Sequence, residues 1–101
     1  MKKYTVVWLP DAAQDLYEHV IFLSKVSIDA AFELREAIYN ESQSLANFPD
    51  RNPLFEMTDN FPYKARRAVV SKRYLILYSI ETGNIIIYRV LDCRKGFEYI
   101  I

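Results

Sequence analysis

The side chains with the most obvious chemistry in this sequence are the Lys and Arg residues of positions 61–101. This half carries eight basic and three acidic residues, whereas positions 1–60 carry five and ten, so a net charge of zero hides halves of +5 and −5. The eight are Lys64, Arg66, Arg67, Lys72, Arg73, Arg89, Arg94 and Lys95. Basic groups concentrated on a small domain attract phosphates or carboxylates. The sequence therefore predicts a polyanion or an acidic protein as a partner.

The residue types needed for several other chemistries are scarce or isolated. Gly83 and Gly96 are the only glycines, which excludes a glycine-rich phosphate loop. Cys93 is the single cysteine, so no disulfide or CxxC pair forms, and a lone thiol suits a reducing compartment. His19 is the single histidine and has no neighbouring ligand for a metal. We expect no metal, no cofactor and, without a membrane-length apolar stretch, a cytoplasmic protein.

The elements that must position these side chains begin with a strand and two helices. Residues 4–8 are β-branched and aromatic, which predicts a strand. Pro10 suits the first turn of a helix, and apolar residues then recur every three or four positions as far as Leu23. Ser27 predicts the N-cap of a second helix, which Pro49 would end. The short break between the two helices predicts an antiparallel helical hairpin.

The second half predicts three strands after a polar loop at residues 51–62. The strands are expected at 65–70, 74–80 and 85–91, with a tight turn at Gly83. The whole chain, residues 1–101, is thus predicted to be one α+β domain of order β-α-α-β-β-β. A small antiparallel sheet would pack against the N-terminal helical hairpin.

Both faces of the later strands are apolar. Leu75 and Leu77 would lie on one face, and Tyr74, Ile76 and Tyr78 on the other. The hairpin can cover one face only, so we expect a partner to cover part of the second.

Four segments carry a resemblance to a known family. They are WLPDAAQDL at 8–16, LANFP at 45–49, RAVVSKRYLILY at 67–78 and IIYRVLDCRK at 86–95. In this order they resemble the first strand and helix start, the end of the second helix, the middle hairpin and the basic exit of the RelE/ParE superfamily of bacterial toxins. The resemblance spans nearly the whole chain. It implies the toxin of a type II toxin–antitoxin pair, neutralised by a small acidic antitoxin in a hetero-oligomer.

The resemblance implies two alternative activities. RelE-like members cleave mRNA on the ribosome, and ParE-like members inhibit DNA gyrase. We expect ribosome-dependent mRNA cleavage first, gyrase inhibition as the alternative, and an inactive toxin-like binding domain as the third possibility. Leu75 stands where nuclease members carry an arginine, and this departure favours the gyrase alternative.

The same resemblance implies three catalytic residues. Arg94 matches the arginine after the last strand, Arg73 would share a strand face with Leu75 and replace the missing arginine, and Tyr99 nearly matches a C-terminal tyrosine. Cleaving RNA without a metal needs charge stabilised on the phosphate, which the arginine fork does well, and a proton for the leaving oxygen. Tyr99 or Glu98 would supply the proton. The alternative is that all four are solvated surface groups.

The remaining basic residues are candidates for nucleic-acid contact. They are Lys64, Arg66, Arg67, Lys72 and Lys95. They would meet phosphates or acidic groups of the antitoxin, or else line a solvated strand edge where Lys prevents aggregation. Convergence of Arg73 and Arg94 on the basic sheet face would favour cleavage, and divergence would favour gyrase binding.

Overall fold

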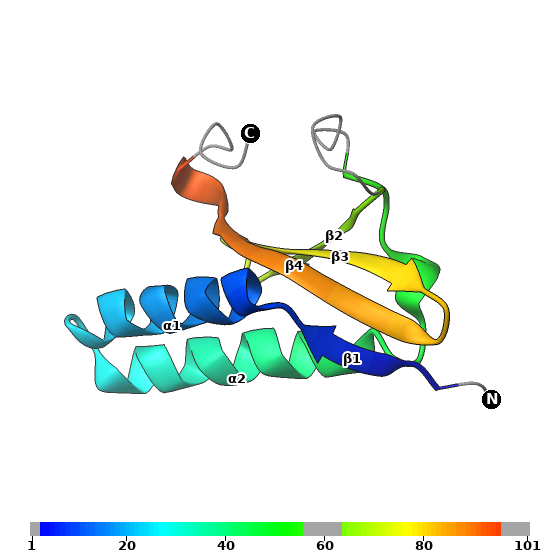
Figure 1. Ribbon diagram of the computed structural model, residues 1–101. Helices are drawn as coiled ribbons and strands as arrows, with labels where there is room; N and C mark the ends of the chain where they lie inside the picture. The colour runs from blue at the N-terminus through cyan, green and yellow to red at the C-terminus, as the bar shows by residue number, and fades with distance from the viewer. Residues whose placement is uncertain (1–2, 56–63, 96–101) are drawn as a thin grey trace.

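The computed structural model describes residues 3–55 and 64–95 (Figure 1). The elements in chain order are β1 (Thr5–Trp8), α1 (Pro10–Ser24), α2 (Ile28–Ser44), the 3-10 turn η1 (Pro49–Arg51), β2 (Arg66–Val70), β3 (Tyr74–Glu81), β4 (Asn84–Asp92) and the 3-10 turn η2 (Cys93–Lys95). The predicted α+β class and the order β-α-α-β-β-β are confirmed.

The two helices begin as the sequence predicts. Pro10 opens α1, with Asp11 in its first turn near the positive end of the helix dipole. Ser27 caps α2, its hydroxyl oxygen accepting the N–H of Ala30 at 3.1 Å. α2 ends at Ser44, earlier than the predicted stop at Pro49. The chain turns here because the carbonyl of Ala46 accepts the N–H of Tyr4 (3.1 Å), which ties the end of the hairpin to β1.

The sheet is mixed, with the strand order β1-β4-β3-β2. Strands β2, β3 and β4 pair antiparallel as predicted, but β1 lies parallel to β4, with Thr5 opposite Asn84. The expectation of a wholly antiparallel sheet is therefore corrected for β1. The helical hairpin and two further strands separate β1 from β4, and such a long connection permits a parallel pair.

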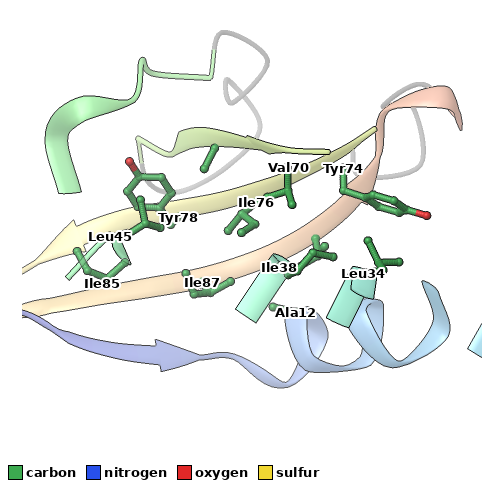
Figure 2. Close-up of a cluster of buried hydrophobic side chains, with 12 residues drawn as sticks. Ala12, Leu34, Ile38, Leu45, Val70, Tyr74, Ile76, Tyr78, Ile85 and Ile87 are labelled. Atoms are coloured by element: carbon green, nitrogen blue, oxygen red, sulfur yellow. The ribbon is translucent and has the colours of Figure 1, made fainter. Parts of the chain in front are cut away.

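One face of the sheet carries the main core against the helices (Figure 2). Ile38 of α2 and Ile76 and Ile87 of the strands are fully buried there. A bulge opposite Leu77 and Tyr78 places one extra residue, Tyr88, in β4. The bulge shifts the alternation of side chains, so Ile87 and Val90, three positions apart, both contribute to this core.

The second face is covered, at least in part, by the chain itself. Phe55 packs with Leu75, Leu77 and Leu91, and all four side chains are buried. Of the twelve large exposed apolar side chains among the described residues, seven lie on the helical hairpin: Tyr17, Ile21, Phe22, Val26, Ile28, Phe32 and Tyr39. We call these seven residues the hairpin patch. Phe55 of the same chain thus covers part of the second face, and the expectation that a partner covers another part of it stays a prediction. Across the described ranges, no helix is long and apolar enough to cross a membrane.

Candidate functional site

The first feature of the site is the edge of β4 that β1 does not reach. The last backbone bond along this edge joins the N–H of Leu9 to the carbonyl of Ile87 (3.0 Å), although β4 continues to Asp92. α1 lies beside this stretch (Figure 1). The Asp15 carboxylate accepts the N–H of Val90 at 3.0 Å, and the Nε2–H tautomer of His19 donates to the carbonyl of Val90 at 2.8 Å. Asp15 and His19, one helical turn apart, therefore bond to the N–H and the carbonyl of Val90, which a neighbouring strand would otherwise pair.

Asp15 also holds Arg89. The guanidinium donates from Nε to Oδ2 (2.6 Å) and from Nη2 to Oδ1 (2.9 Å), a bidentate ion pair. Asp15 is buried, with 9% of its surface exposed. Arg89 is therefore a paired residue. His19 also packs against the Tyr74 ring at 5.1 Å between centroids, so its contacts are structural.

Arg94 is bound to Asp92 at the C-terminal end of β4. Its Nε and Nη2 donate to the two carboxylate oxygens (3.1 and 2.8 Å), and its backbone N–H donates to Oδ1 (2.9 Å). The hydrogen bond from the Arg94 side chain lowers the pKa of Asp92, although burial acts in the opposite direction. The same bond raises the pKa of Arg94. The positive charge of Arg94 is therefore already compensated.

A hollow of about 560 Å³ lies between α1 and this end of the sheet. Its walls are Asp15, Glu18, His19, Phe22, Tyr74, Arg89, Val90 and Asp92. Arg94 contacts one wall of this hollow through Asp92.

Arg73 lies in the turn between β2 and β3 and lines a second hollow. Its neighbours there include Leu23, Glu33 and Leu34 of the helical hairpin. Tyr74 lines both hollows, and the carbonyl of Arg73 accepts the N–H of Cys93 at 2.7 Å. The backbones at Arg73 and Cys93 are thus adjacent. Arg73 lines the second hollow, and the Arg94 side chain is bound to Asp92.

Arg66 fastens η1 to the sheet. Its Nη1 donates to the carbonyls of Asn52 (2.6 Å) and Asp50 (3.3 Å). Beside it, the buried hydroxyl of Tyr78 donates to the carbonyl of Pro49 (2.6 Å), and burial raises the pKa of Tyr78. These contacts give Arg66 a structural role, and its expected contact with nucleic acid stays a prediction.

The other predicted residues are placed as follows. Lys64, Arg67 and Lys72 are exposed. Lys95 ends η2, and Tyr99 lies outside the described residues. Within the described ranges, no group of His, Cys, Asp or Glu is arranged to hold a metal ion.

The residues missed by sequence reasoning are the two carboxylates. The sequence gives Asp15 no evident site role, although its spacing of four from His19 indicates a shared helix face. Asp92 is two residues from Arg94, and such proximity signals a local ion pair. Neither spacing by itself shows that the Asp15 carboxylate accepts hydrogen bonds from β4.

Comparison with known proteins places this arrangement in a family. A search of curated proteins finds no match. A solved structure described as the chromosomal ParDE TA system from P. aeruginosa has a TM-score of 0.72 at 14% identity, over 91% of this chain and 98% of that one, which shows the same fold. Residues 6–97 match the model of the family described as ParE toxin of type II toxin-antitoxin system, parDE. The chain therefore belongs to the ParE family of type II toxins.

Proposed function

We propose that this toxin arrests growth by binding DNA gyrase and that it does not cleave RNA. The observation that carries the proposal is the bidentate ion pair of Arg94 with Asp92. An arginine that stabilises a phosphate in a transition state needs its charge and its fork free for that phosphate. Here a carboxylate of the same chain occupies the fork.

The position of Arg73 supports the same proposal. It lines a different hollow, next to Glu33, while Arg94 is bound at the end of β4. The expected cleavage machinery would need both guanidinium groups on one phosphate. Membership of the ParE family adds to this, because gyrase inhibition is the activity that the resemblance implies for ParE-like members.

A cognate antitoxin is the second part of the proposal. The matched structure is described as a ParDE toxin–antitoxin system, and this chain exposes the hairpin patch and a set of basic side chains. We propose that the product of an adjacent gene covers these surfaces. Co-purification from a strain that expresses both genes tests this, and a monodisperse toxin with no affinity for that product at micromolar concentration would contradict it.

The target is tested by measuring both candidate activities on one sample. The purified chain should inhibit DNA supercoiling by gyrase, and induced cells should show unchanged mRNA 5′ ends by primer extension. Arg94→Ala and Arg94→Lys would be compared with Arg35→Ala, a control that removes an exposed arginine of the hairpin. Circular dichroism would confirm that each variant folds. New mRNA ends that vanish in folded Arg94→Ala, together with normal supercoiling, would instead establish the nuclease.

A further inference from the structure

The outer edge of β2 is only partly paired. β2 is the last strand of the sheet, with β3 on its inner side. On its outer side the chain before it forms a short bridge, in which Leu54 lies opposite Arg66. The N–H of Phe55 donates to the carbonyl of Ala65 (2.8 Å), and the N–H of Arg67 donates to the carbonyl of Pro53 (3.1 Å). These bonds cover the start of the strand.

The pairing stops at Arg67 for a chemical reason. Pro53 has no N–H, so it cannot return a hydrogen bond to the carbonyl of Arg67. Backbone groups two residues apart in a strand point to the same side, and β2 pairs with β3 without a register shift. The N–H and carbonyl of Val69 therefore point to the outer edge, as those of Arg67 do. Within the described ranges, no chain segment pairs with Val69 on this side.

The charged side chains of residues 64–73, which include this open edge, are all basic. Lys64, Arg67, Lys72 and Arg73 are exposed, and residues 64–73 contain no acid. Val69, between Arg67 and the turn, is 53% exposed. Among the described residues, this edge thus offers the unpaired N–H and carbonyl of Val69 beside the positive charges of Arg67 and Lys72.

We propose that the outer edge of β2, residues 67–71, binds an acidic extended peptide segment as a fifth strand. Backbone hydrogen bonds from Val69 would supply the register, and carboxylates on the added strand would meet Arg67 and Lys72. The inference rests on the proposed function in one respect, because it takes this segment to belong to the antitoxin. It does not depend on the target of the toxin. The opposing role for these residues is a gatekeeper edge, which repels every added strand.

A peptide probe separates the two roles. The probe is a synthetic peptide of alternating Val and Glu, acetylated and amidated at its ends, titrated into the full chain by calorimetry. A peptide of alternating Val and Lys tests whether binding needs acidic side chains. A fully N-methylated peptide of Val and Glu tests whether binding needs the backbone N–H groups of the peptide. We expect the Glu peptide alone to bind, with an affinity that falls as salt rises.

Two variants at one position locate the site. Val69→Pro removes the outward N–H without touching a bond to β3, which an edge strand tolerates, whereas Val69→Ala shortens the side chain and keeps the N–H. Without the N–H of residue 69, one carbonyl of the bound peptide stays unpaired. Val69→Pro should therefore bind the Val and Glu peptide about tenfold more weakly than Val69→Ala does.

Three results would overturn the inference: equal affinity of the two variants, equal binding of the N-methylated peptide, or no binding of the Glu peptide. Thermal unfolding checks that Val69→Pro folds. If it does not fold, the N-methylated peptide on the wild-type chain decides the question. An antitoxin that binds Val69→Pro and Val69→Ala equally would exclude the edge and leave the antitoxin proposal intact.

Discussion

Asp15 is the residue on which the junction between the first helix and the last strand depends. Its carboxylate accepts three hydrogen bonds, two from the Arg89 guanidinium and one from the N–H of Val90. All three donors lose their acceptor together when the carboxylate is removed. Unpaired donors at a mostly buried position cost more than the bonds themselves contribute.

We therefore expect Asp15→Ala to lower the free energy of unfolding by about 2–3 kcal/mol. The value lies below that for a fully buried pair because the Arg89 side chain is 26% exposed and water can replace part of the contact. Urea denaturation measures the change. Glu18→Ala, an exposed position on the same helix, is the matched control and should change stability by less than about 0.5 kcal/mol. Equal effects of the two substitutions would show that the hydrogen bonds of Asp15 do not contribute to stability.

Asp92 makes stability depend on pH in the acid range. Its pKa in the folded protein is lowered below the ordinary value of 3.8, chiefly by the Arg94 side chain. A carboxyl group with a lowered pKa stabilises the fold above its ordinary pKa, and this contribution is lost as pH falls through the folded value. Arg94→Gln removes the main cause of the lowering.

The difference in unfolding free energy between wild type and Arg94→Gln should therefore be constant above pH about 4 and shrink at lower pH. Urea titrations at a series of pH values measure it. A difference that stays the same down to pH about 2 would mean that the Arg94 contact with Asp92 does not contribute to folding.

At the scale of elements, the turn between β2 and β3 is strained. Ser71 and Lys72 adopt φ of 53° and 61°, the left-handed region that disfavours residues with a Cβ. The turn between β3 and β4 also contains a residue of positive φ, but that residue is Gly83, whose φ is 76°. The sequence therefore places glycine at one tight turn and leaves the other to two less suitable residues.

Replacing Lys72 by Gly should make the protein more stable than replacing it by Ala, by about 1 kcal/mol. Both variants lose the same charged side chain, so the difference between them isolates the backbone. Gly83→Ala should destabilise by a similar amount, and since no atom lies within 4 Å of the added Cβ, that cost is also in the backbone. Thermal unfolding compares the three variants. If Lys72→Gly is no more stable than Lys72→Ala, the turn is not strained in solution.

Sequence reasoning recovered the elements that local chemistry determines. The cap at Ser27, the start at Pro10 and the strands around Ile76 and Ile87 follow from spacing and side-chain type within a few residues. The parallel pairing of β1 depends on β4, which lies far along the chain, so the local spacing of residues does not predict it.

The candidate site was recovered less well for the same reason. Arg66 and Arg94 were identified as basic groups, but their acceptors, the Asn52 carbonyl and the Asp92 carboxylate, are set by tertiary structure and by a turn. Tyr99 lies outside the described residues, and no observation tests the catalytic roles expected for Tyr99, Arg73 and Arg94, which the proposed gyrase binding does not require.

At the scale of the whole molecule, apolar surface and positive charge lie in different places. The hairpin patch belongs to residues 10–44, which carry seven acids and two bases, whereas the exposed Lys64, Arg67 and Lys72 lie around β2. A partner that covers both surfaces must bring apolar and basic groups to the helices and acidic groups to the sheet edge. Uncovered, the hairpin patch is a surface for self-association.

We expect the toxin alone to self-associate with rising concentration, and Phe22→Ser with Phe32→Ser to suppress this. Both side chains are more than 60% exposed, at 68% and 63%, so their loss should change stability by less than about 0.5 kcal/mol each. Sedimentation velocity measures the association, and Lys25→Ser, a polar substitution between the helices, serves as control. Association that persists in the double variant would assign it to another surface.

The pairing of β1 with β4 has a consequence for synthesis of the toxin. β1 can pair only after β4 has been made, because Thr5 lies opposite Asn84. Likewise, Asp15 binds Arg89, which follows it by 74 positions. Contacts this distant in sequence cannot form until β4 has been made, and they slow folding. A ribosome that stops before β4 is made should therefore release a chain that neither folds nor poisons the cell, whatever the target of the finished toxin.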